Sequence, residues 1–232
     1  MHNHDASPSI LDCVTIETGP EPCKTVIWLH GLGADGHDFE PIVAELGVAR
    51  SVAIRFVFPH APIRPVTING GIAMRAWYDI KGLDLDRDED RSGIAGSVGQ
   101  VDALIRHEQA RGVSARDIVL AGFSQGGVVA LRCGLSRSQA LAGVIALSCY
   151  LPEAAQLDQW LTPAGRMTPV FMGHGTLDPV VPVVLGREAA RRLAEAGVPL
   201  SWGEWPIQHG VCAEEIAAID RWLRERFSGV GR

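Results

Sequence analysis

A serine between two glycines is the residue that most suggests chemistry in this sequence. Gly122, Ser124 and Gly126 form a GxSxG pattern, which follows the apolar run IVLA and precedes the helix-like run GVVALRCGL. The glycines allow a sharp turn, so the serine hydroxyl would stand above a strand end and at a helix N-terminus. The alternative is a plain strand-to-helix turn in which the serine only caps the helix. The context favours a nucleophilic serine.

A serine hydroxyl is a weak nucleophile near neutral pH, so it needs a base that a third group orients. In chains with this turn, the partners follow in the order serine, acid, histidine. Only His174 and His209 follow Ser124. His209 comes after the last predicted strand, whereas His174 would need its acid before it. We therefore predict His209 as the base and a structural role for His174.

Asp178 is the acid that we predict to orient His209. It follows the apolar run PVFMG, in the turn HGTLDPVVP, and so belongs at the carboxyl edge of a sheet, where catalytic groups gather. Asp158 follows an apolar strand less directly, and Glu204 lies inside a predicted strand. These two carboxylates are the alternatives, and helix capping is the non-catalytic alternative for Asp178.

The tetrahedral intermediate of acyl transfer needs two hydrogen-bond donors for its oxyanion. The amide of Gln125, directly after the nucleophile, would supply one donor. The loop after the early strand TVIWL would supply the other through the amide of Leu32. Gly31 and Gly33 permit the tight path of that loop.

A dinucleotide site is the competing interpretation of the same loop, because Gly31, Gly33 and Gly36 also satisfy GxGxxG. That site needs an acidic residue about 20 positions further on, at the end of the next strand. Residues 51–60 contain none. We therefore expect no nicotinamide cofactor, and no other cofactor.

The acidic residues Asp84, Asp86 and Asp88 begin like a calcium-binding loop. Glu89 stands where that loop requires glycine, and Ala95 stands where it requires glutamate. We predict a solvated loop and no metal site.

Short apolar runs alternate with helical patterns along the chain. The later runs are almost unbroken, as in parallel strands that helices cover on both faces. Helical periodicity is found over 94–105 and 216–227, and a helix is also expected over 183–196. The alternation predicts an α/β fold, a three-layer, doubly wound, mostly parallel sheet. The predicted strands are 10–17, 25–29, 53–58, 118–122, 143–149, 169–173 and 200–205.

The length of 232 residues suits one domain, 1–232. Residues 59–90, which we call the excursion, interrupt the alternation of strands and helices with prolines, glycines and an acidic run. This composition predicts an irregular lid or pocket wall.

Composition excludes several classes of function. The net charge is −6 without a basic patch, so nucleic acid is not an expected partner. No apolar run is long enough to span a membrane, and the start MHNHDASPSI lacks the features of a secretory signal. The five scattered cysteines form no disulfide or zinc pattern. We expect a cytoplasmic chain that acts on a small-molecule ester.

Taken together, these motifs resemble bacterial carboxylesterases related to acyl-protein thioesterases and lysophospholipases, within the α/β-hydrolase superfamily. The resemblance covers most of the chain. It depends on HGLGADG at 30–36, FPHAP at 58–62, MRAWYDI at 74–80, GFSQGG at 122–127, ALSCYLP at 146–152, HGTLDPVVP at 174–182 and HGVCAEEI at 209–216.

The resemblance implies the same triad and the same two oxyanion amides. It further implies that Trp77 borders the substrate pocket, and that the chain forms a homodimer as many members do. Ile207 and Gly210 stand where the family usually has methionine and often has serine, which leaves the substrate preference open.

We predict a serine carboxylesterase that forms an acyl-enzyme and prefers short to medium acyl chains, because the excursion at 59–90 offers little material for a long tunnel. The alternative is an acyl-protein thioesterase or lysophospholipase that acts on longer acyl chains. A catalytically silent binding member of the fold is a third hypothesis, which the complete triad disfavours.

Overall fold

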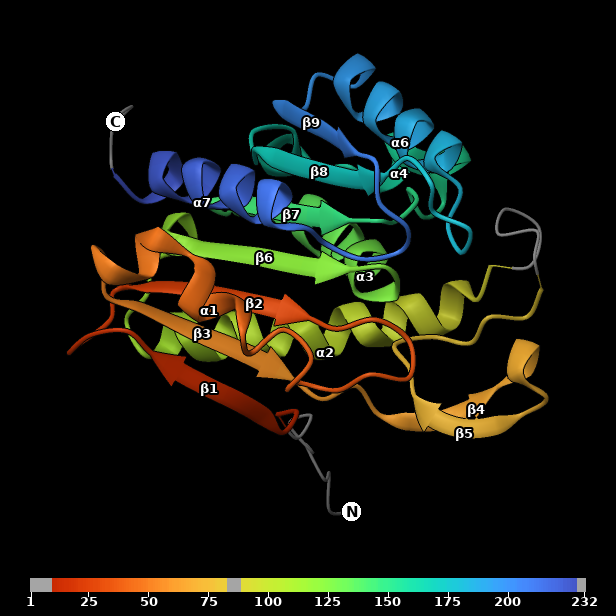
Figure 1. Cartoon of the computed structure of the whole chain (residues 1–232), viewed down its shortest axis with the longest axis horizontal. Coiled ribbons are helices and arrows are strands. Elements are labelled where there is room, and N and C mark those ends of the chain that lie inside the picture. Colours follow the sequence, from red (N-terminus) through yellow and green to blue (C-terminus); the bar gives the residue numbers. More distant parts are fainter. Residues whose placement is uncertain (1–9, 83–88, 229–232) are drawn as a thin grey trace, which may run out of the picture.

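A seven-stranded, mostly parallel sheet forms the centre of the molecule (Figure 1). The computed structural model describes residues 10–82 and 89–228. The strand order is β1-β3-β2-β6-β7-β8-β9, and only β1 runs antiparallel to its neighbour, β3. This sheet, with helices on both faces, confirms the predicted α/β fold. The strands are β1 Cys13–Glu17, β2 Lys24–Leu29, β3 Ile54–Pro59, β6 Ile118–Phe123, β7 Gly143–Leu147, β8 Val170–Gly175 and β9 Leu200–Trp205.

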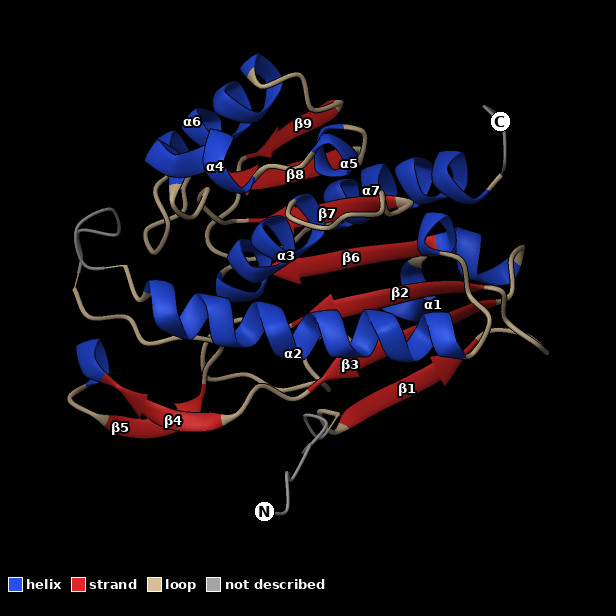
Figure 2. Ribbon diagram, turned by 180° about the vertical axis from the view of Figure 1, so that it is seen from behind, coloured by secondary structure: helices blue, strands red, loops and turns tan. Residues whose placement is uncertain are grey.

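Helices cover both faces of the sheet because side chains alternate along each strand. In β2, Ile27 and Leu29 belong to the apolar cluster with α2, α3 and α6, whereas Val26 and Trp28 pack with α1 and α7 on the other face (Figures 1 and 2). The longer helices are α2 Arg91–Ala110, α3 Gln125–Leu135, α6 Val183–Glu195 and α7 Ala213–Phe227. The short ones are α1 Ile42–Glu45, α4 Leu157–Trp160 and α5 Pro163–Arg166, with 3-10 turns η1 Gly47–Arg50, η2 Thr67–Asn69, η3 Ala115–Asp117 and η4 Ala154–Gln156.

The predicted strands and helices are present with shifted ends. The run at 143–149 leaves the sheet after Leu147, because Ser148 adopts a positive φ of 48°. The run at 10–17 pairs only from Cys13 onward.

A small hairpin interrupts the α/β alternation within the predicted excursion. Strands β4 Ile63–Val66 and β5 Ile72–Arg75 pair antiparallel, with Val66 opposite Ile72. Gly70 and Gly71 close the connection with positive φ angles of 68° and 79°. The hairpin projects at the end of the molecule where the carboxyl ends of β2, β6, β7 and β8 lie (Figure 1). The acidic run with Asp84, Asp86 and Asp88 lies outside the described residues.

Helix α7 runs along the sheet in the opposite direction. It begins close to the carboxyl ends of the strands and ends at Phe227, beside their amino ends (Figure 1). Within 10–82 and 89–228, no helix is both long and apolar enough to cross a membrane.

Candidate active site

Ser124 stands in a strained turn between β6 and α3. Its φ and ψ are 55° and −119°, a region that costs a residue other than glycine about 1–3 kcal/mol. Its backbone N–H donates to the carbonyl of Leu147, 2.8 Å away. The turn requires its glycines: a Cβ on Gly126 would lie 2.4 Å from the carbonyl oxygen of Leu29, and one on Gly122 would lie 2.2 Å from that of Gly126. Close packing therefore holds the serine in this conformation.

His209, in the loop between β9 and α7, reaches the serine. Its Nε2 lies 2.9 Å from Oγ of Ser124, and its Nδ1 lies 2.7 Å from Oδ2 of Asp178. A carboxylate only accepts hydrogen bonds, so Nδ1 carries the proton and Nε2 accepts from the serine hydroxyl. The ring of Phe123 packs against the imidazole at 4.7 Å between centroids. The arrangement suits proton transfer from Ser124 to His209.

Asp178 is held by the turn between β8 and α6. Its Oδ1 accepts from the backbone N–H groups of Val180, at 2.8 Å, and Val181, at 2.9 Å. The side chain is buried, with Oδ2 left for His209. Backbone amides therefore fix the direction in which this carboxylate faces the histidine.

The two alternative acids have other partners. Glu204 accepts a bidentate pair of hydrogen bonds from Arg187, at 2.8 and 2.6 Å, and another from the indole of Trp202. The Arg187 guanidinium lowers the pKa of Glu204 to about 2. Asp158 forms an exposed ion pair with Arg166.

His174 supports the turn that carries Asp178. It is fully buried, and its Nε2 donates to the carbonyl of Val181 at 2.8 Å. Nε2 also lies 3.5 Å from Oδ2 of Asp178. Burial lowers the pKa of His174, so the ring is neutral and its proton is on Nε2. Helix α6 packs so closely that a Cβ on Gly186 would lie 2.3 Å from Nδ1 of this ring.

Leu32 and Gln125 both line the space in front of Ser124. Gln125 is the first residue of α3, so its N–H has no carbonyl partner within the helix. Its buried side chain makes two hydrogen bonds that the sequence did not predict. Oε1 accepts from the N–H of Trp77 at 2.8 Å, and Nε2 donates to the carbonyl of Tyr78 at 2.6 Å. Gln125 therefore ties the excursion to the nucleophile helix.

We expected Trp77 to border the substrate pocket, but it is not among the residues that line the cavity. Its side chain is fully buried, and Nε1 donates to the carbonyl of His30 at 2.9 Å. The next residue, Tyr78, lines the cavity instead. The bonds that Gln125 makes to the backbone fix this orientation, and they leave no trace in the sequence pattern.

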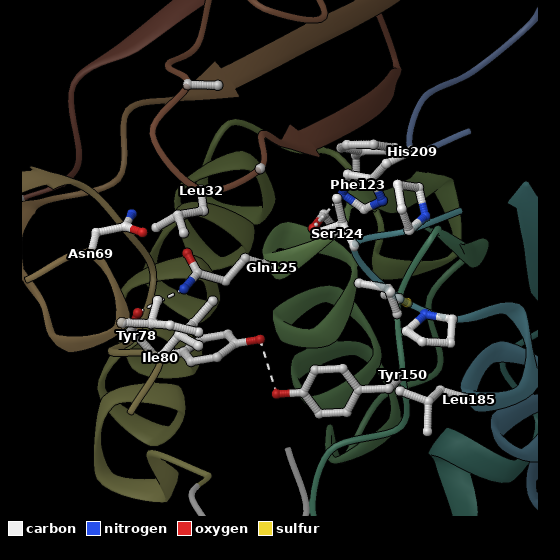
Figure 3. A pocket seen from close by; sticks show the side chains of 18 of the residues that line it. Leu32, Asn69, Tyr78, Ile80, Phe123, Ser124, Gln125, Tyr150, Leu185 and His209 are labelled. Carbon is white, nitrogen blue, oxygen red and sulfur yellow. Dashed lines mark hydrogen bonds between the residues drawn. The ribbon is translucent and has the colours of Figure 1, made fainter. Parts of the chain in front are cut away.

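A cavity of about 590 Å³ opens beside Ser124 and lies among residues of the excursion, of the segment after β7 and of α6 and the turn before it (Figure 3). Its walls are largely apolar, and its volume is within the usual range of ligand pockets. A second hollow of about 390 Å³ shares Asp38, Phe123 and His209 with it and includes Gly210. The apolar side chains of the cavity include Leu32, Ile68, Ile80, Phe123, Val180, Val181 and Leu185.

Comparison with known proteins identifies close relatives. A profile of the phospholipase/carboxylesterase family matches residues 11–226. Acyl-protein thioesterase 1 of Neurospora crassa is 39% identical over 216 residues, which cover 89% of this chain and 88% of that protein. Acyl-protein thioesterase 1 of Cryptococcus neoformans is 35% identical over 235 residues, covering 94% and 98%.

Solved structures agree with this similarity. Arabidopsis thaliana SOBER1 matches with a TM-score of 0.83 at 31% identity, covering 88% of this chain and 98% of that one. Acyl-protein thioesterase 2 of Zea mays matches with a TM-score of 0.82 at 25% identity, covering 93% and 98%.

Proposed function

This chain belongs to the phospholipase/carboxylesterase family and is a serine hydrolase of esters or thioesters. On that premise, we propose that it cleaves long-chain acyl thioesters and esters, with Ser124, His209 and Asp178 as the reacting groups. The observation that carries the assignment of the residues is the unbroken chain of hydrogen bonds, 2.9 Å from serine to histidine and 2.7 Å from histidine to aspartate.

In the proposed reaction, Oγ of Ser124 attacks the acyl carbonyl carbon as its proton passes to Nε2 of His209. Asp178 stabilises the imidazolium that forms and keeps the ring in its orientation. The imidazolium then gives its proton to the leaving thiolate or alkoxide, which leaves an acyl-serine. Water, deprotonated by His209, attacks the acyl-serine, and His209 then gives that proton to Oγ of Ser124 as the carboxylic acid leaves.

The oxyanion of each tetrahedral intermediate is assigned to the amides of Gln125 and Leu32. The Gln125 amide is at the N-terminus of α3, where the helix dipole also favours negative charge. Gly33 supports the Leu32 loop, because its N–H donates to the carbonyl of Arg75 at 2.8 Å. The excursion therefore holds the loop that carries the Leu32 amide, while α3 carries the Gln125 amide.

The acyl chain is assigned to the large cavity, and the leaving group to the side of the second hollow. Apolar walls contribute about 0.8 kcal/mol for each buried methylene, so the cavity favours longer chains until it is full. The relatives named acyl-protein thioesterase support this longer-chain alternative more than the short-chain preference expected from the compact sequence.

A matched panel of substrates tests the proposal. Thioesters and oxygen esters with the same acyl groups, from about two to about sixteen carbons, would be compared by kcat/KM below their micelle concentrations. We expect kcat/KM to increase with chain length and to be higher for thioesters, with a loss of at least about a thousandfold in Ser124→Ala. A maximum for oxygen esters at about four to eight carbons would instead favour the small-ester interpretation.

A further inference from the structure

Two tyrosines meet in the wall of the cavity that lies away from the proposed nucleophile. The hydroxyl oxygens of Tyr78 and Tyr150 are 3.1 Å apart and share a hydrogen bond. Both rings line the cavity, although only 3% of Tyr78 and 7% of Tyr150 are exposed. In Figure 3 their hydroxyl groups point toward each other, and both tyrosines lie below Gln125 and Ser124 in the view. They come from opposite walls, Tyr78 from the segment after β5 and Tyr150 from the segment after β7.

A small, partly open space lies behind this pair, and the residues that line it include Asp79, Lys81, Glu89 and Asp90. A small void of about 10 Å³ is lined by the two tyrosines together with Ile80 and Gly82, and all four residues also line the large cavity. A void of this volume holds about one water molecule at most. The tyrosine pair therefore separates the large cavity from the small void.

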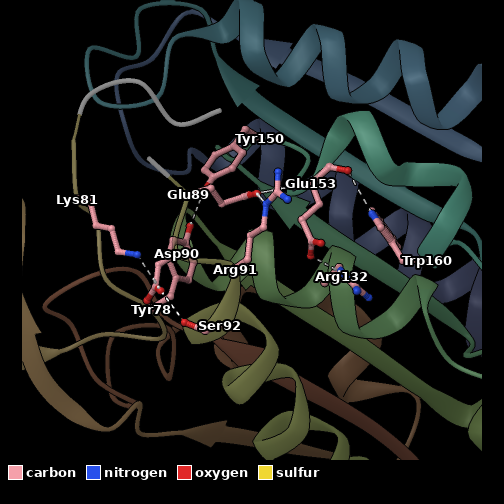
Figure 4. Close-up of polar contacts among 10 residues, drawn as sticks. All are labelled: Tyr78, Lys81, Glu89, Asp90, Arg91, Ser92, Arg132, Tyr150, Glu153 and Trp160. Atoms are coloured by element: carbon pink, nitrogen blue, oxygen red, sulfur yellow. Dashed lines mark hydrogen bonds and ion pairs between the residues drawn. The ribbon is translucent and has the colours of Figure 1, made fainter. Parts of the chain in front are cut away.

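Two neighbouring carboxylates before α2 hold the two walls in place (Figure 4). Asp90 accepts from the N–H of Asp79 at 3.0 Å and pairs with Lys81 at 3.3 Å, on the side of Tyr78. Glu89 accepts from the N–H of Glu153 at 3.1 and 3.2 Å, on the side of Tyr150. Because Glu89 and Asp90 are adjacent in the chain, the separation between the walls is fixed by one short segment.

We propose that the Tyr78–Tyr150 pair is the end stop of the acyl cavity and sets the longest acyl chain that the enzyme accepts. The inference depends on the proposed function, because it assigns this cavity to the acyl chain. Up to the pair, each added methylene increases kcat/KM by up to about fourfold. A longer chain has to displace the two rings, and beyond them it meets a void of only about 10 Å³ that Lys81, Glu89 and Asp90 help to line. The gain with length therefore ends where the terminal methyl group meets the rings.

Substitution of Tyr150 by leucine or phenylalanine tests the end stop. Tyr150→Leu shortens the side chain and joins the void to the cavity, whereas the control Tyr150→Phe keeps the ring in the wall. We expect Tyr150→Leu to extend the longest accepted chain by about one carbon, into the space that the ring leaves, and to raise kcat/KM at that length by up to about fourfold. The control should keep the wild-type limit, and the length profile of each variant is compared after scaling to that variant's own kcat/KM for short substrates.

The Tyr78→Leu variant and a binding measurement with fatty acids test the same length limit independently. Tyr78→Leu opens the same partition from the opposite wall, and thermal melting shows whether each variant is folded. Calorimetric titration of the Ser124→Ala variant with fatty acids of graded length measures the same limit without turnover.

The possible results separate the two proposals. An unchanged length limit in folded Tyr150→Leu and Tyr78→Leu overturns the end stop, and so does an equal extension in Tyr150→Phe. Wild-type hydrolysis that persists in Ser124→Ala overturns the proposed function, while the fatty-acid titration still tests the end stop.

Discussion

The turn at Ser124 and the hairpin of the excursion meet at the same cavity, but they are built in opposite ways. Around Ser124, a Cβ on Gly126 would collide with the backbone of β2, and the strands on both sides are buried. In the hairpin, Ile63 and Ile72 are 66% and 64% exposed. The difference shows that the proposed reacting groups are on densely packed elements, whereas part of the proposed substrate wall is on a thinly packed one.

Gln125 connects the two regions. Its backbone belongs to the dense turn, while its side chain holds the backbone at Trp77 and Tyr78. A change in the dense region should therefore affect every substrate, whereas a change in the hairpin should affect only those long enough to reach it.

The largest effect is expected from Ser124→Ala. The variant should lose about a thousandfold to a millionfold in kcat for every acyl length, because the nucleophile is removed. Labelling by a fluorophosphonate probe should disappear as well, while thermal melting confirms that the fold is intact. Turnover equal to wild type would contradict the assignment of Ser124.

Asp178→Asn should lower kcat by about ten thousandfold, because the amide no longer holds the imidazole in the required tautomer. The matched control is Glu204→Gln, which alters a carboxylate whose partners are Arg187 and Trp202. We expect the control to stay within about threefold of wild type. A loss in the control alone, measured by kcat at saturating substrate, would move the acid to Glu204.

The free energy of unfolding should depend on pH through Glu215, a buried residue in the first turn of α7. This side chain is buried against β8, and burial raises its pKa to about 8 from 4.5. Between these values the folded chain retains a proton that the unfolded chain has released. Its contribution is therefore complete below about pH 4.5, and the free energy of unfolding falls by up to about 1.4 kcal/mol per pH unit as the pH rises to about 8.

Glu215→Gln should remove this slope and make the variant more stable than wild type at alkaline pH. Denaturant unfolding of both proteins across the window measures the difference, in which other titrating groups cancel. Parallel curves would contradict the expectation.

The smallest effect is expected in the hairpin. Ile68 lines the cavity at 40% exposure, whereas Ile72 is more exposed and is not part of its lining. Ile68→Ala should lower kcat/KM for long acyl chains by up to about tenfold, because it removes apolar contact, and should leave short chains unchanged. The control Ile72→Ala should leave both unchanged. Equal losses at all lengths in Ile68→Ala would mean that the hairpin is not a separate substrate wall.

Much of the dense region could be predicted because its signals are local. The GxSxG turn, the apolar runs before it and before Asp178, and the position of His209 after the last strand each follow from a short stretch of sequence. The parallel direction of the buried strands could be predicted from their unbroken apolar composition.

The hairpin and the cavity wall could not be predicted in the same way. The strands IRPV and IAMR are short, mostly not buried, and one contains Pro65, so neither shows a clear period of two. The contact between Tyr78 and Tyr150 joins positions 72 residues apart, and the orientation of Trp77 depends on the side chain of Gln125. Such contacts arise only after the sheet has brought the segments together.

The course of α7 determines how the molecule can be attached to a surface. This helix leads the chain away from the loop of His209 and ends at the amino ends of the strands (Figure 1). A support or a fused partner joined beyond Phe227 would therefore hold the molecule from the side opposite the cavity. On a bead or sensor chip, such a tether leaves the cavity facing the solution.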